Sequence, residues 1–187
     1  MADLEGKEAD TRDIALALPK GAALIEILTY RDFDYTASSG GKWLPARYAA
    51  FVLKAGEPDD IHLADLGPAE EINRAVTALR GDVSSDRDYG QSARTLHDLV
   101  FAPLSEHLAG VETLYVSPDG ALNLVPLEIL LTENNRFLVE ERLFIYLASG
   151  RDLMTFDDSG YEATDSAVLG DPMFDAAMAA PGAAPGH

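Results

Sequence analysis

The sequence contains no cysteine among its 187 residues. This absence excludes disulfide bonds, zinc sites built on thiolates and a cysteine nucleophile within the chain. Any thiol chemistry would have to come from polypeptide that these residues do not include.

Basic residues are scarce. Lys and Arg number 14 against 32 Asp and Glu, which gives a formal net charge of −18. A surface this negative repels phosphate backbones instead of gathering them. We therefore do not expect nucleic acid as a partner.

Long apolar runs are also missing, since no stretch approaches the roughly 18 residues that suggest a membrane helix. The N-terminus, Met-Ala-Asp-Leu-Glu, has neither the basic flank nor the apolar stretch of a signal peptide. Apolar residues make up 47% and charged residues 25%, as is ordinary for globular proteins. We expect a soluble, cytoplasmic protein with no membrane partner.

Local catalytic and metal-binding motifs are absent. No H-E-x-x-H, G-x-S-x-G, Walker loop or G-x-G-x-x-G occurs. The histidines are His62, His97, His107 and His187. Ten residues separate His97 from His107, which predicts different faces of one helix. Each histidine is more simply explained as a surface residue or a hydrogen-bonded structural one.

Adjacent acidic residues occur at 59–60, 70–71, 140–141 and 157–158. Neighbouring side chains of a strand point to opposite faces and cannot chelate one cation together. We interpret these pairs as solvated surface. The sequence thus predicts no catalytic, cofactor-binding or metal-binding residue, and no cofactor.

The first third predicts an antiparallel β-meander. Apolar segments 23–30, 47–54 and 61–66 have the length and composition of strands, and the Ser/Gly-rich segment 36–42 predicts a hairpin loop or a mobile connection. A short helix capped by Asp10 or Thr11 precedes them and stops at Pro19.

The middle of the chain predicts two helices. Pro68 suits the first helical position of a helix that ends before Gly81, and a polar loop 82–90 follows. The second helix is longer, with a kink at Pro103. One apolar face of that helix comprises Leu96, Leu99, Val100, Leu104 and Leu108.

Strands and helical turns alternate in the second half, which favours a largely parallel sheet. The sequence predicts strands at 113–116, 140–147 and 167–169, a turn at 117–120 and a helical turn at 151–156. An Ala/Pro/Gly-rich segment from 176 predicts a flexible linker. The expected organisation is one domain portion over 1–175 and a linker or truncated end over 176–187, with more polypeptide expected to follow.

Three segments occur in a characteristic order: LYVSPDGALNLVPLEIL at 114–130, FLVEERLFIYLASGRDLM at 137–154 and VLGDPMF at 168–174. This set resembles the CHAT family, caspase-like domains often attached to tetratricopeptide repeats in bacterial proteins. The earlier segments ALPKGAALIEILTY and YAAFVLKAG are also similar to the start of such domains. The similarity is expected to span roughly residues 14–175.

The resemblance implies an α/β fold with a caspase-like central sheet flanked by helices, incomplete in this chain. It also implies a cysteine peptidase that uses a His-Cys dyad, with the histidine in a His-Gly segment and the cysteine on a following strand end, both downstream of the similar region. This sequence has no His-Gly pair and no cysteine. No catalytic residue carries over.

Two functional hypotheses follow. In the first, the chain is the scaffold-forming N-terminal part of a CHAT-type cysteine peptidase domain, inactive in isolation, with an apolar sheet face left uncovered. Its partners would be proteins: a downstream catalytic segment, tetratricopeptide repeats or a peptide substrate of the full-length protein. In the second, it is a non-catalytic interaction module whose acidic surface steers a basic partner. A hydrolase built on acids and histidines is a third class, for which the sequence offers no geometry.

Overall fold

The computed structural model describes residues 10–37 and 40–156. The helices are α1 Thr11–Ala17, α2 Ala69–Ser84, α3 Gly90–Val100 and α4 Leu153–Phe156. The strands are β1 Ala22–Tyr30, β2 Phe33–Asp34, β3 Lys42–Trp43, β4 Arg47–Lys54, β5 Ile61–Pro68, β6 Thr113–Ser117 and β7 Leu143–Tyr146. Short 3-10 helices are η1 Ala102–Leu104, η2 Gly120–Leu124, η3 Leu127–Ile129, η4 Leu138–Glu140 and η5 Gly150–Asp152.

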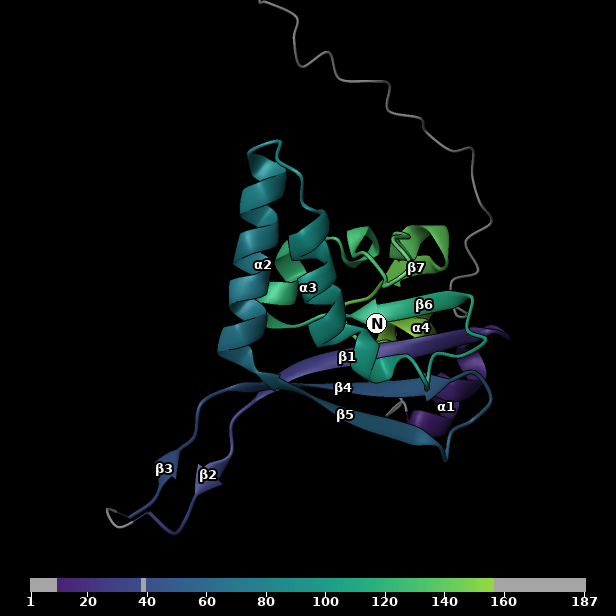
Figure 1. Cartoon of the computed structure of the whole chain (residues 1–187). Coiled ribbons are helices and arrows are strands. Elements are labelled where there is room, and N and C mark those ends of the chain that lie inside the picture. The colour runs from purple at the N-terminus through teal and green to yellow at the C-terminus, as the bar shows by residue number, and fades with distance from the viewer. Residues whose placement is uncertain (1–9, 38–39, 157–187) are drawn as a thin grey trace, which may run out of the picture.

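The centre of the fold is a five-stranded mixed sheet with the strand order β5-β4-β1-β6-β7. Strand β4 runs antiparallel to both β1 and β5, which confirms the predicted meander. Strands β1, β6 and β7 run parallel to one another, as the alternating second half predicts. Strands β2 and β3 form a separate hairpin that projects from the body (Figure 1).

One face of this sheet packs mainly against α2 and α3 (Figure 1). We call it the first face. Alternate side chains of β1 and β4 point to it and are buried there: Ala23, Ile25 and Ile27, and Tyr48, Ala50 and Val52. The large cluster around them is completed by helix residues such as Ile72, Leu79 and Leu96 and by the segment 120–138. This cluster is the main hydrophobic core.

The opposite, second face is covered differently. Helices α1 and α4 contact each other and cover one end of it. A smaller cluster forms there from Ala15, Leu18, Ala22, Leu24, Leu53, Leu147 and Leu153. Because β1 has buried side chains on both faces, its sequence is apolar at nearly every position instead of alternating.

Local signals explain the start of the chain. The side chain of Asp10 accepts a hydrogen bond from the backbone N–H of Asp13 at 2.8 Å and caps α1, as predicted. The helix ends at Ala17, just before Leu18 and Pro19. This short helix is therefore held by its cap and by the burial of Ala15 and Leu18 on the second face.

Two helix predictions were wrong in detail. Helix α2 continues through Gly81 to Ser84, and Asp86, with φ of +51°, supplies the left-handed residue that follows its end. Pro68 is the residue before α2, at the end of β5, and not its first helical residue.

The long kinked helix is not formed either. Helix α3 ends at Val100, and Pro103 lies in η1, because proline has no N–H to continue an α-helical ladder. The strand predicted over 140–147 is shorter, Leu143–Tyr146, since Glu140 belongs to η4.

Several predictions fall outside the described residues: the strand 167–169, the linker 176–187, the acid pair 157–158 and His187. None of the helices within 10–37 and 40–156 combines the length and apolar character that crossing a membrane requires.

Candidate functional site

The carboxyl ends of parallel strands are the usual place for sites in α/β sheets. Here Asp119, just after β6, reaches the end of β1. Its Oδ2 atom accepts hydrogen bonds from the backbone N–H of Thr29 at 2.7 Å and from the Thr29 hydroxyl at 2.6 Å. Its Oδ1 atom accepts from the N–H of Gly120 at 2.7 Å. The carboxylate therefore ties two neighbouring strand ends together.

We call the contacts of Asp119 with Thr29 and Gly120 the joint at the strand ends. Tyr48 of β4 completes this joint from the first face. Its hydroxyl accepts a hydrogen bond from the N–H of Ala121 at 2.9 Å and donates one to Oδ1 of Asn73, in α2, at 3.0 Å. Gly120 has φ of +56°, and a β-carbon there would lie 2.4 Å from the Tyr48 hydroxyl. Glycine is required for both conformation and space.

These contacts set the charge of the joint. The hydrogen bond from the Thr29 side chain is the main reason that the pKa of Asp119 is lowered. Burial raises the pKa of Tyr48. Asp119 is thus a carboxylate whose oxygens already accept structural hydrogen bonds. The segment 117–120, predicted as a turn, is the end of β6 followed by the start of η2, which Asp119 caps. The tie to Thr29, 90 residues away, is the part that sequence reasoning missed.

A charged side chain in β1 makes a second long-range tie. Glu26 accepts a hydrogen bond from the N–H of Gly150 at 2.7 Å, and Ser117 donates its hydroxyl to the carbonyl of Ala148 at 3.0 Å. The segment after β7 is therefore fastened to the middle of β1 and to the carboxyl end of β6. The one sequence feature that could have indicated this role is that Glu26 is the single charged residue of an otherwise largely apolar strand.

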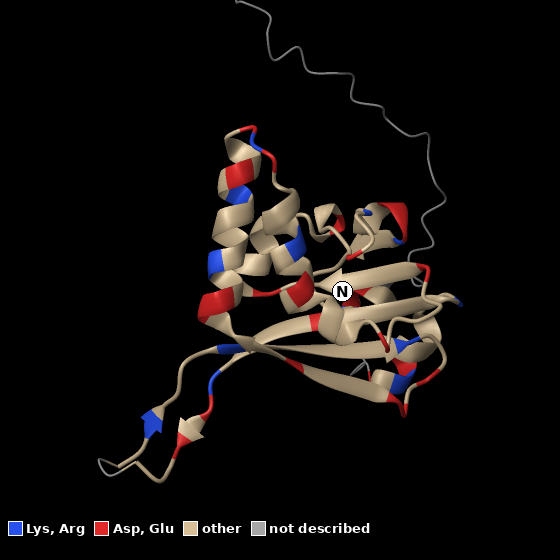
Figure 2. Cartoon of the chain, viewed as in Figure 1, with Lys and Arg blue, Asp and Glu red and all other residues tan. Residues whose placement is uncertain are grey.

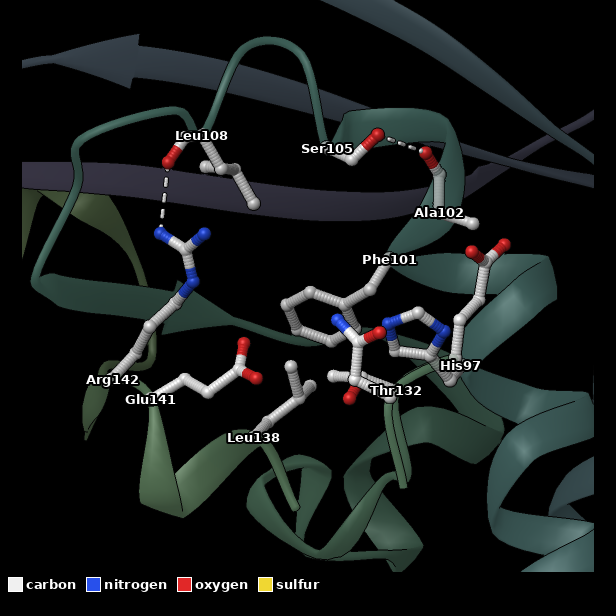
Figure 3. A pocket seen from close by; sticks show the side chains of 11 residues that line it. His97, Phe101, Ala102, Ser105, Leu108, Thr132, Leu138, Glu141 and Arg142 are labelled. Atoms are coloured by element: carbon white, nitrogen blue, oxygen red, sulfur yellow. Dashed lines mark hydrogen bonds between the residues drawn. The ribbon is translucent and has the colours of Figure 1, made fainter. Parts of the chain in front are cut away.

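A pocket of about 250 Å³ lies elsewhere, between the end of α3 with η1 and the segment 132–142 (Figure 3). Its lining includes His97, Phe101, Ser105, Thr132, Glu141 and Arg142. His97 is nearly buried, and its Nδ1 atom lies 3.1 Å from Oδ1 of the neighbouring Asp98.

The polar groups of this pocket are largely occupied by structural bonds. Arg142 donates to the carbonyls of Leu108, at 2.8 Å, and Val111. The Ser105 hydroxyl donates to the carbonyl of Ala102 at 2.8 Å, and Thr132 donates to that of Arg136 at 3.0 Å. Among the described residues, no hydroxyl is hydrogen-bonded to a histidine. The pocket thus has no nucleophile–base pair in place.

The other two described histidines form a pair that the sequence did not reveal. The rings of His62, in β5, and His107, after η1, stack with their centroids 3.2 Å apart. His107 lies outside α3, so the expectation that it shares a helix with His97 was wrong. The pair arises because η1 and the turn after it pack against β5, which no local pattern encodes.

The described acidic pairs lie at exposed positions. A carboxylate oxygen of Asp59 lies 3.8 Å from a guanidinium nitrogen of Arg12. Glu70 and Glu71 lie in the first turn of α2. The Glu140 carboxylate accepts a hydrogen bond from the backbone N–H of Phe137 at 2.7 Å. In the part of the chain that the structure describes, no group of three or more metal-ligating side chains occurs.

The comparison with known families addresses the carboxyl-terminal half. The family model of the CHAT domain matches residues 90–186, just over half of the chain. The chain belongs to the CHAT domain family. No match was found among curated proteins.

The CHAT match contains the segments 114–130, 137–154 and 168–174 and confirms the resemblance drawn from them. Residues 14–89, also expected to be similar, lie outside the matched range. Strand β1 nevertheless pairs with β6, so this CHAT domain shares one sheet with the preceding meander. The division at residue 175 stays a prediction.

Proposed function

We propose that this chain builds the scaffold of a CHAT-type, caspase-like cysteine peptidase domain and does not cleave peptides by itself. The observation that carries the proposal is the joint at the strand ends. In a chain with no cysteine, the side chains of Asp119 and Tyr48 are engaged in holding β1, β6 and α2 together.

The chemistry supports this division of roles. A cysteine peptidase needs a thiolate to attack the carbonyl and an imidazole to manage its proton and that of the leaving amine. The chain supplies no thiol, and His97 is engaged with Asp98. The dyad would come from polypeptide that these 187 residues do not include, held on the sheet that they provide.

The first test is an assay of the purified chain against a fluorogenic peptide library and a thiol-directed peptide probe, with papain as the positive control. We expect neither cleavage nor labelling. Cleavage that tracks the folded protein through purification would overturn the proposal.

A second test measures the intact mass of the native product in its source cells, using an antibody raised against this region. We expect a product heavier than 20.1 kDa that contains the cysteine and the His-Gly segment. A product of 20.1 kDa would contradict a peptidase assembled on one chain.

The alternative is a non-catalytic interaction module derived from a CHAT domain. The part of the second face beyond α1 and α4 favours it, because apolar side chains are accessible there. If the chain is the scaffold of a peptidase domain, the partners that we propose are a downstream catalytic segment, tetratricopeptide repeats or a peptide substrate of the full-length protein. For the module, the partner is a separate protein.

A further inference from the structure

Beyond α1 and α4, no helix or strand within residues 10–37 and 40–156 covers the second face, and an apolar hollow of about 240 Å³ lies there. Strands β1, β4 and β5 line it with Leu28, Tyr30, Ala49, Phe51, Leu63 and Asp65. Phe51 and Leu63 are direct partners in the β4–β5 register, and Ala49 and Asp65 are the next pair along. The hollow is thus a surface feature of the sheet itself, open towards β5.

Strand β5 is also an edge. Within the described residues, its backbone pairs only with β4, which leaves its outer row of N–H and C=O groups without a strand partner. Natural sheets protect such edges with Lys, Pro or covering elements. Here Pro68 ends the strand, but Ile61 and Leu63 are 46% and 56% exposed on the second face.

These two features select the shape of an occupant. Free backbone groups on an edge are satisfied by another extended backbone, whereas a helix has already paired its own N–H and C=O groups. Alternate side chains of an added strand would point to the second face, beside Ile61 and Leu63. The edge and the hollow together therefore fit an extended segment with apolar residues at every second position.

Charge selects the partner further. The net charge of −18 opposes close approach of a second copy and attracts a basic chain. The middle of β4 has neither acidic nor basic residues and is tan in Figure 2. Within β5 the one Asp, Glu, Lys or Arg residue is Asp65, which forms an ion pair with Arg47. Apart from Asp65, whose charge Arg47 balances, the docking surface is apolar, and the acidic field comes from the surrounding molecule.

We propose that the outer edge of β5 and the adjoining hollow bind an extended segment of a separate basic protein, which adds to the sheet as a further strand. Apolar side chains at alternate positions occupy the hollow, and Lys or Arg residues lie between them. This binding does not depend on whether the chain lacks peptidase activity, so the two proposals can fail separately.

The test uses the full chain and the synthetic peptide Lys-Val-Lys-Leu-Lys-Val-Lys, labelled for fluorescence anisotropy at physiological salt. A peptide of the same composition without alternation, Lys-Lys-Val-Leu-Val-Lys-Lys, controls for charge. We expect one alternating peptide per chain, bound at least about tenfold more tightly than its isomer, because only the former buries all its apolar side chains on one face.

Leu63→Lys is expected to weaken binding at least about tenfold, the loss of roughly one buried leucine. Leu124→Lys is the matched control, since Leu124 is 55% exposed but lies in η2, and we expect no change. Ile61→Lys gives a second variant in the same strand. Circular dichroism checks that each variant folds.

Three results would overturn the proposal. The first is that the alternating peptide does not bind, or that it binds no more tightly than its isomer or equally well to the wild type and to Leu63→Lys. Equal binding would mean nonspecific electrostatic attraction. The second is a dimer in light scattering that Leu63→Lys splits, which would make a second copy the occupant. The third is slow exchange, in the free chain, of the β5 amides that point away from β4, which would mean that the chain's own residues already cover the edge.

Discussion

The two faces of the sheet are covered to different extents, although the same strands form both and supply apolar side chains to each. In β4, Ala50 and Val52 are buried against the helices of the first face, while Phe51, between them, is only partly buried on the second. Apolar character in a strand thus shows that a face is suited to burial. What covers that face depends on elements elsewhere in the chain or outside it.

The strongest test of this difference between the two faces is to truncate one leucine on each face. Leu96→Ala, in α3 against the first face, should lower the free energy of unfolding by about 3 kcal/mol, since a fully buried leucine leaves a cavity. Leu63→Ala should cost less than about 0.5 kcal/mol, because Leu63 is largely exposed. Urea unfolding followed by circular dichroism measures both. Equal losses would mean that the second face is covered in solution.

The joint at the strand ends should be the next most sensitive place. Gly120→Ala should lower the free energy of unfolding by about 2 kcal/mol, because it combines a positive φ with a clash against the Tyr48 hydroxyl. Gly110→Ala separates the two causes, since Gly110 has φ of +75° but open space around its β-carbon. Its cost should be about 1 kcal/mol. If urea or thermal unfolding shows the same loss of unfolding free energy for both variants, the Tyr48 side chain can move away from the added methyl group and the contact is not rigid.

Acid should weaken the same joint. The pKa of Asp119 is lowered, chiefly by the Thr29 hydroxyl, from the usual 3.8. Its stabilising effect is therefore fully present above that value and is lost as pH falls through the lower pKa of the folded state. Asp119→Asn should cost about 1 kcal/mol at neutral pH, because the amide has one accepting oxygen and its NH2 group must face either the donors of Thr29 or the N–H of Gly120.

Unfolding free energies measured from pH 7 to pH 2 should show the wild type and Asp119→Asn converging below about pH 4. Asp60→Asn, at an exposed turn, serves as the control and should stay within about 0.5 kcal/mol of the wild type at neutral pH. A constant gap between wild type and Asp119→Asn across this range would show that the carboxylate charge is not what stabilises the joint.

Sequence reasoning located most elements because their signals are local. The cap at Asp10 and the strands over 47–54 and 113–116 each follow from a few neighbouring residues. It failed where the deciding partner is distant: Asp119 with Thr29, Glu26 with Gly150 and His62 with His107. Of the candidate site, the position of Asp119 and Gly120 just after a strand was predictable, but the long-range partners were not, because side-chain pairing over 90 or 124 residues leaves no periodic trace.

The smallest effect we expect concerns the accessible apolar surface of the second face. Leu63→Lys should reduce the fluorescence of bound anilinonaphthalene sulfonate and leave the free energy of unfolding within about 0.5 kcal/mol, because it removes exposed apolar area without touching the core. Leu124→Lys removes a leucine of almost equal exposure, 55% against 56%, away from the hollow, and should leave the dye signal nearly unchanged. A dye signal equally insensitive to both changes would mean that the hollow beside β5 is closed in solution, so that the difference between the two faces does not persist there.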